Sequence, residues 1–173
     1  MSIEFWLMKF FDRGFEFLRQ IFKKQENLKQ NSIDLVRAFE DFDIWLDKIL
    51  DQFEKEVLKT THECNLHGML RSSVYLQLRF EMVKKHQNDI NEYWLKNIER
   101  EIEDFLRICG RKNLNDIKFL EKKEKIKQIT TKKENAIDGL SDKTLNELKK
   151  MGFSEIDIDG ARKRVWKNLV NVN

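Results

Sequence analysis

The sequence contains no proline and only six glycines in 173 residues. Both residue types interrupt helices, proline because it lacks the amide hydrogen and glycine because its backbone is unusually free. Their scarcity beside abundant Leu, Ile, Phe, Glu and Lys excludes a loop-rich chain. No segment alternates apolar and polar residues as a half-buried strand does. The sequence therefore predicts an all-α protein, long enough to bury a core within one domain.

Cysteine, long apolar runs and net charge are also scarce. Two cysteines, Cys64 and Cys109, do not make a disulfide framework, which favours a reducing compartment. No apolar run approaches the roughly 20 residues that span a bilayer, and the N-terminus lacks the features of a signal peptide. The formal net charge of +3 is too small to indicate nucleic-acid binding by itself. We expect a cytoplasmic protein.

Amphipathic helices are abundant instead. Residues 1–30 are expected to form one such helix, with seven aromatic residues between positions 3 and 22: Phe5, Trp6, Phe10, Phe11, Phe15, Phe17 and Phe22. A face of this kind normally packs on the bundle or on a second subunit. A membrane-surface helix is the less favoured alternative, because the polar face mixes acids with bases. This much apolar surface predicts a homodimer, formed through this helix or the hairpin face.

Residues 31–173 are expected to form a helical bundle built on a long antiparallel hairpin, about 33–66 and 69–109. Asn31 or Ser32 would cap its first helix. That helix carries a heptad seam spaced 4-3-4-3-4, consisting of Leu35, Phe39, Phe42, Leu46, Ile49 and Phe53. Gly68 would form the turn, because a left-handed residue often follows a helix end.

The second helix of the hairpin is interpreted as the central one. It would begin at Met69, and its broad buried face would combine Met69, Leu76, Phe80 and Val83 with Leu70, Val74 and Leu78. The polar residues 86–89 would break or kink it. A further segment with Trp94, Ile98, Ile102, Phe105 and Cys109 on one face would then end at Gly110.

The C-terminal third is expected to be more broken. Residues 111–135 are interpreted as a basic connection with a thin apolar stripe, which would be either a poorly anchored helix or a mobile segment. Residues 137–139 would form a turn, and Ser141 would cap a short helix that ends at Gly152. A loop over residues 153–160 and a final basic helix from Ala161 to Val170 would follow.

Charge is unevenly distributed along the chain. Residues 32–58 contain eight acids and three bases, whereas residues 111–134 contain nine bases and four acids. This polarity predicts either that the two segments dock on each other or that a basic pole meets an anionic partner.

Two clusters resemble functional sites. His62, Cys64 and His67 suggest metal ligands, but the histidines are five residues apart rather than four, and Cys109 would have to complete the set. We predict no metal site there. Arg79 and His86 lie two turns apart, near one face of a helix. Their spacing fits an R-x(4–6)-H ribonuclease motif, but the favoured alternative is a pair of solvated surface residues.

Residues 70–83, LRSSVYLQLRFEMV, resemble the core helix of HEPN-superfamily domains, with an acidic residue where Glu81 stands. Residues 140–170 are similar to the approach to the catalytic helix in stand-alone members. The resemblance implies an all-α, RNA-related protein of a defence or toxin–antitoxin type, with an antitoxin as one partner. Such proteins are typically dimers that cleave RNA without metal, at a composite site between the subunits.

The sequence departs from the family pattern because no R-N-x-x-x-H motif occurs before Asn173. Either the sequence stops short of the motif, or this member lacks the standard chemistry. Arg71 and Glu81 would then be supporting groups only. An RNA backbone could still be held by four basic residues, Arg162, Lys163, Arg164 and Lys167. We therefore expect weak, salt-sensitive RNA binding without efficient cleavage, and no cofactor.

A non-enzymatic alternative stays open. In it, the chain is a helical interaction protein that binds a partner through its N-terminal amphipathic helix. A weaker resemblance, of residues 148–169 to the end of a SAM domain, is also to an interaction module.

Overall fold

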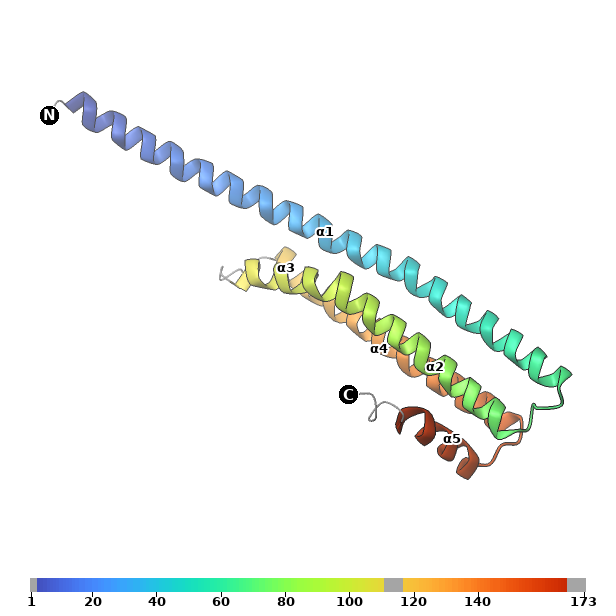
Figure 1. The fold of residues 1–173 in the computed structure, drawn as a ribbon. Coiled ribbons are helices and arrows are strands. Elements are labelled where there is room, and N and C mark those ends of the chain that lie inside the picture. Colours follow the sequence, from blue (N-terminus) through green and yellow to red (C-terminus); the bar gives the residue numbers. More distant parts are fainter. Residues whose placement is uncertain (1–2, 111–116, 168–173) are drawn as a thin grey trace.

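The computed structural model describes the backbone of residues 3–110 and 117–167, and the side chains of residues 34–107 and 120–167. The helices are α1 (Ile3–Leu66), α2 (Ser73–Trp94), the π-helix η1 (Leu95–Glu99), α3 (Arg100–Gly110), α4 (Ile117–Lys150) and α5 (Glu155–Lys167) (Figure 1). Within these ranges the chain forms no strand, so the all-α prediction is confirmed. The side chains of the aromatic stretch 3–22, of Cys109 and of residues 169–170 lie outside the description.

Helix α1 is a single helix of 64 residues. The predicted helix start at Asn31 or Ser32 is therefore wrong. These residue types cap a helix only when the chain before them leaves the helical conformation, and they are tolerated inside one. In Figure 1 the N-terminal part of α1 extends beyond all the other helices, and its C-terminal part runs beside α2 and α3. The heptad seam lies in that second part, where all its residues from Leu35 to Phe53 are buried except Ile49, which is partly buried.

A glycine turn separates α1 from α2, as the sequence predicts. Gly68 has φ +66°, and its N–H donates to the carbonyl of Asn65, while the N–H of Met69 donates to the carbonyl of Cys64. This pair of bonds is the Schellman motif. Ser72 then caps α2, with its Oγ accepting from the N–H of Tyr75 at 3.2 Å. Helix α2 therefore begins at Ser73, and the predicted start at Met69 is wrong. The arrangement of α1 and α2 is compatible with the long antiparallel hairpin.

The buried face of α2 differs in part from the prediction. Leu76, Phe80 and Val83 are buried, but Val74 and Leu78 are 50% and 36% exposed. Tyr75 and Arg79 occupy the buried side in their place. The predicted break over residues 86–89 is also wrong, because α2 continues through them to Trp94.

The irregularity lies further on, in η1. From Leu76 to Trp94 the buried apolar residues Leu76, Phe80, Val83, Ile90 and Trp94 fit an alternation of four and three residues, which would continue at positions 97, 101 and 104. The buried Arg79 and His86 each lie one residue before a position of this pattern. The chain instead places Ile98, Ile102 and Phe105 against the core, each one residue later. A π turn closes i→i+5 bonds and so accommodates one extra residue. The η1 segment therefore keeps one continuous apolar face from α2 to α3.

Helix α4 is also continuous, so two predictions are wrong: the turn at 137–139 and the cap at Ser141. For the basic segment 111–135, the described residues from Ile117 onward are helical, which is one of the two alternatives that the sequence left open. Helix α4 packs mainly on α2, and two surface ion pairs join it to α1. Lys132 contacts Asp43 at 2.7 Å, and Lys143 contacts Glu54 at 2.5 Å. Each pair joins residues 89 apart in sequence, so α4 runs parallel to α1 in a constant register. The two oppositely charged segments thus contact each other within the chain.

Helix α5 begins earlier than predicted. Gly152 ends α4 as expected, with φ +89° and a bond from the N–H of Phe153 to the carbonyl of Leu148. Ser154 then accepts from the N–H of Asp157 at 3.2 Å, so residues 155–160 are helical rather than a loop. The buried side of α5, with Ile158, Ala161 and Val165, packs on α2.

Candidate functional site

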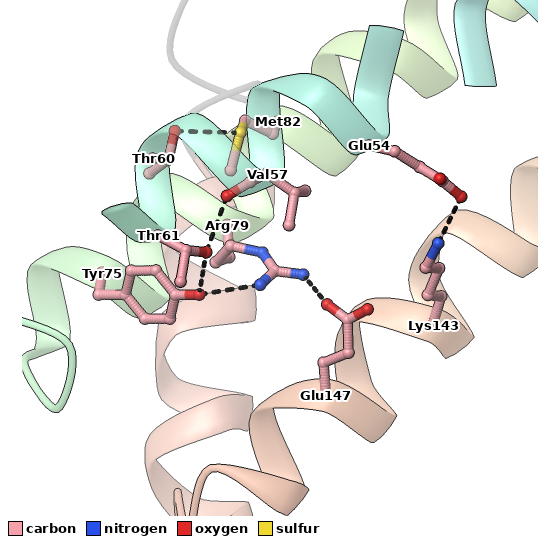
Figure 2. Close-up of polar contacts among 9 residues, drawn as sticks. All are labelled: Glu54, Val57, Thr60, Thr61, Tyr75, Arg79, Met82, Lys143 and Glu147. Atoms are coloured by element: carbon pink, nitrogen blue, oxygen red, sulfur yellow. Dashed lines mark hydrogen bonds and ion pairs between the residues drawn. The ribbon is translucent and has the colours of Figure 1, made fainter. Parts of the chain in front are cut away.

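The guanidinium of Arg79 lies inside the bundle, not on the surface as we expected. Its residue is 2% exposed. Nη2 contacts Glu147 Oε2 of α4 at 2.5 Å, and Nη1 donates to the hydroxyl of Tyr75 at 2.9 Å (Figure 2). Glu147 itself is about one-third exposed, so this ion pair lies at the edge of the core.

The hydrogen bonds that link Arg79 through Tyr75 to Thr61 can be formed with only one choice of donors and acceptors. Thr61 Oγ1 donates its only proton to the carbonyl of Val57 at 2.7 Å. The Tyr75 hydroxyl, 2.9 Å from the same Oγ1, must therefore donate to Thr61 while it accepts from Arg79. The chain of bonds runs from α4 through α2 to α1, and Figure 2 shows its members pointing at one another between the three helices. It holds the helices together and offers no free base for catalysis.

His86 is buried as well, at 0% exposure, and the surface interpretation is wrong for it too. Its Nε2 lies 3.1 Å from Glu56 Oε2 on α1, and its ring meets Phe53 edge-on at 5.4 Å. Lys85 donates to the same carboxylate at 2.8 Å. Partial burial raises the pKa of Glu56, but hydrogen bonds from Lys85, Gln52 and His86 outweigh it and lower the pKa to about 2. Glu56 is thus a stable anion that anchors α2 to α1.

The four candidate catalytic residues do not converge. Arg79 contacts α4, His86 contacts α1, and both are enclosed by protein. Glu81 is exposed, accepts a bond from Gln77 at 2.9 Å, and lines a surface hollow with Lys84 and Lys85. Arg71 lies at a different place, in the turn before α2. No pair among them can act together on one phosphate in this arrangement.

The metal candidates are separated by exposure. His62 and His67 are exposed, whereas Cys64 is buried in the core at the hairpin turn. Among the residues that the structure describes, no group of three His, Cys, Asp or Glu side chains is placed to hold a metal ion. No described helix has the length and hydropathy required to cross a membrane.

The four basic residues assigned to RNA binding lie on the solvent side of α5. Arg162, Lys163, Arg164 and Lys167 are all exposed. Arg164 also lines an open hollow of about 380 Å³ between α5 and the beginning of α2, together with Arg71, Ser73, Asp157 and the apolar Leu76, Phe153 and Ile156. Two arginines that are far apart in sequence thus meet at one surface hollow.

Sequence reasoning missed Glu56, Glu147, Tyr75 and Thr61. One signal was available: Arg79 follows Leu76 by three residues and precedes Val83 by four, so it falls on the buried stripe of α2. A buried arginine requires an acidic partner. Which acid supplies it depends on how α4 packs, and no local pattern gives that.

Comparison of the chain with protein families, curated proteins and solved structures finds no match.

Proposed function

We propose that this protein is a non-catalytic helical interaction protein of the cytoplasm, which associates with a second copy of itself through the N-terminal half of α1. One observation carries the proposal: that half of α1 extends past the ends of α2, α3 and α4 (Figure 1). At 1.5 Å per residue the whole helix is roughly 96 Å long. Within the part of the chain that the structure describes, other helices run beside its C-terminal part alone.

A helix gains most of its stability from packing its apolar face, not from its own backbone. Residues 3–22 carry seven aromatic side chains, and a helical projection places Ile3, Phe10, Phe17 and Ile21 along one side. None of the other described helices runs beside this stretch (Figure 1). A projecting helix of this composition therefore requires an external partner in water.

A second copy suits this helix better than an unrelated surface. Two copies present the same apolar face, so an isologous pair buries both at once. The polar positions carry both signs, for example Lys9, Asp12 and Glu16, which lets two such helices lie side by side without net repulsion.

Light scattering after size exclusion, at tens of micromolar, tests the proposal. The variant Phe10→Glu/Phe17→Glu changes two positions seven residues apart on the apolar face. We expect wild type to be a dimer and this variant a monomer with unchanged helicity. The control Gln20→Glu/Asn27→Glu adds the same charge at the same spacing on the polar side and should stay dimeric. A monomeric wild type, or equal effects of both variants, would contradict the proposal.

A second candidate function is RNA binding, as the HEPN resemblance implies. The exposed basic residues of α5 support it, because phosphate contacts require only charge and reach. In that case the protein belongs to a defence or toxin–antitoxin system with an antitoxin partner. We expect salt-sensitive binding and no efficient cleavage, since Arg79 and His86 are engaged between helices.

Incubation of the purified protein with total RNA, without added metal, tests this second candidate. Robust cleavage that disappears in His86→Ala, in a variant whose circular dichroism shows a folded protein, would mean that the buried pair does act on RNA. Absence of any RNA binding at low salt would exclude the RNA-related function.

A further inference from the structure

We propose that the hollow between the turn at Gly68 and helix α5 binds one nucleotide unit, with Arg71 and Arg164 as the two groups that hold its phosphate. The site deepens the RNA-binding candidate, and as a site on a polynucleotide it rests on that function. The argument starts from the two arginines. Arg71 belongs to the turn before α2, and Arg164 to the C-terminal half of α5.

Neither guanidinium is used by the fold. Both residues are exposed, and neither has a hydrogen bond or an ion pair with another described residue, unlike the buried Arg79. The acid in the hollow, Asp157, is bound by the hydroxyl of Ser154 at 2.6 Å instead. Two arginines that approach one hollow from two elements provide the fork-shaped donors that match phosphate oxygens. Ser73 lines the same hollow, and its side chain carries a further hydrogen-bond donor.

The rest of the lining selects among anions. Leu76 and Phe153 form an apolar wall, and Ile156, 84% exposed, continues it outward. Asp157 adds an acceptor for an N–H or O–H of the ligand. The best ligand therefore combines a phosphate, a flat apolar body and hydrogen-bond donors. A nucleotide has all three, with a base for the apolar wall and sugar or base donors for the carboxylate.

The position of the hollow suits the end of a single-stranded RNA as well as a free nucleotide. Its volume of about 380 Å³ lies within the range of roughly 300–1,000 Å³ that is typical of small-molecule sites. Arg164 is shared between the hollow and the basic surface formed by Arg162, Lys163 and Lys167. An RNA strand whose terminal nucleotide lies in the hollow would then place its following phosphates along these basic side chains.

Binding measurements on the full chain at low salt test the site. The probes are a ten-nucleotide single-stranded RNA with a fluorescent 3′ end, free adenosine monophosphate and inorganic phosphate. We expect Arg71→Ala and Arg164→Ala each to weaken RNA and mononucleotide binding by roughly fivefold to tenfold, the loss of one charge-assisted contact. The control Arg162→Ala removes the same charge from the same helix outside the hollow, and should weaken binding by about twofold at most.

The outcomes separate the site from the function. If RNA binds but all three variants lose affinity equally, the hollow is not a site, and only the basic surface of α5 is used. If none of the probes binds, both the site and the RNA-related function are wrong. If inorganic phosphate binds as tightly as the mononucleotide, the apolar wall makes no contact and the ligand is not a nucleotide. Selective loss in Arg71→Ala and Arg164→Ala supports the proposal.

Discussion

Deletion of one residue from η1 should be tolerated, although a deletion inside a helix usually is not. Lys96 is exposed, and its side chain makes one surface ion pair, with Glu92 at 3.2 Å. Removing it moves Ile98, Ile102 and Phe105 one position back, to the places that the spacing of α2 anticipates. The extra residue that the π turn accommodates is then gone, and an uninterrupted α-helix should bury the same side chains.

The size of the effect follows from the geometry. One residue turns an α-helix by about 100° and advances it by about 1.5 Å. In the Lys96 deletion this rotation cancels the one-residue shift between the apolar spacing of α2 and that of α3. The main loss is then a surface ion pair worth about 0.2–0.5 kcal/mol. Deletion of Lys48, which is exposed in the middle of α1, has no offset to cancel. It rotates Phe53 and Cys64 away from the core relative to Leu46, and each large apolar side chain exposed costs about 1.5–3 kcal/mol.

Urea unfolding followed by circular dichroism measures both deletions against wild type. We expect the Lys96 deletion to stay within about 1 kcal/mol of wild type, with an unchanged dependence on urea. The Lys48 deletion should lose at least about 4 kcal/mol or fail to fold. Equal destabilisation by the two deletions would refute the register explanation of η1.

Three further predictions concern stability. Arg79→Ala should cost about 3–5 kcal/mol in urea unfolding, because it leaves Glu147 without its partner, and Arg79→Met/Glu147→Met should recover most of this loss. A double variant as weak as the single one would mean that the ion pair itself, and not the unpaired charge of Glu147, accounts for the loss. Glu56 has a pKa of about 2 in the folded protein against 4.5 unperturbed, so its contribution is complete above pH 4.5 and disappears as the pH falls to 2. Glu56→Gln should therefore lower the free energy of unfolding by about 1–2 kcal/mol at pH 7 and leave it unchanged near pH 2. The loss at pH 7 is less than the full pKa shift implies, because the side chain is partly solvated. A loss independent of pH would contradict the ionic role. Gly68→Ala, at φ +66°, should lower stability by about 1–2 kcal/mol, because alanine is strained in this conformation. Gly139→Ala lies inside α4 with open space around it, and should raise stability by about 0.5–1 kcal/mol. Shifts of the same sign for both variants in thermal melts would refute the conformational argument.

The parts of the fold that depend on local chemistry could be predicted from the sequence. The seam from Leu35 to Phe53 is readable because helical spacing alone places these residues on one side. Gly68 and Gly152 end helices because few other residues adopt positive φ. The capping predictions at Asn31 and Ser141 are wrong, since a residue that can cap a helix can also lie inside one. Whether it does so is decided by the packing of distant segments.

The candidate site was less predictable. Ordinary preferences place arginine and histidine at the surface, and that preference failed for Arg79 and His86. Their acidic partners, Glu147 and Glu56, lie on other helices, 68 and 30 residues away. Sequence alone also gave no reason to pair Arg71 with Arg164, because only the docking of α5 on α2 creates the hollow between them.

The parallel alignment of α1 and α4 has a consequence for the speed of folding. Contacts across the turn at Gly68 link residues close in sequence, such as Thr61 and Tyr75, 14 apart, whereas the ion pairs between α1 and α4 close loops of 89 residues. Longer loops lose more chain entropy on closure, and a larger mean separation slows folding. We therefore expect α1 and α2 to come together before α4 docks. Lys133 of α4 lies over the ring of Trp94 at 5.1 Å, so the fluorescence of Trp94 should report that slower docking.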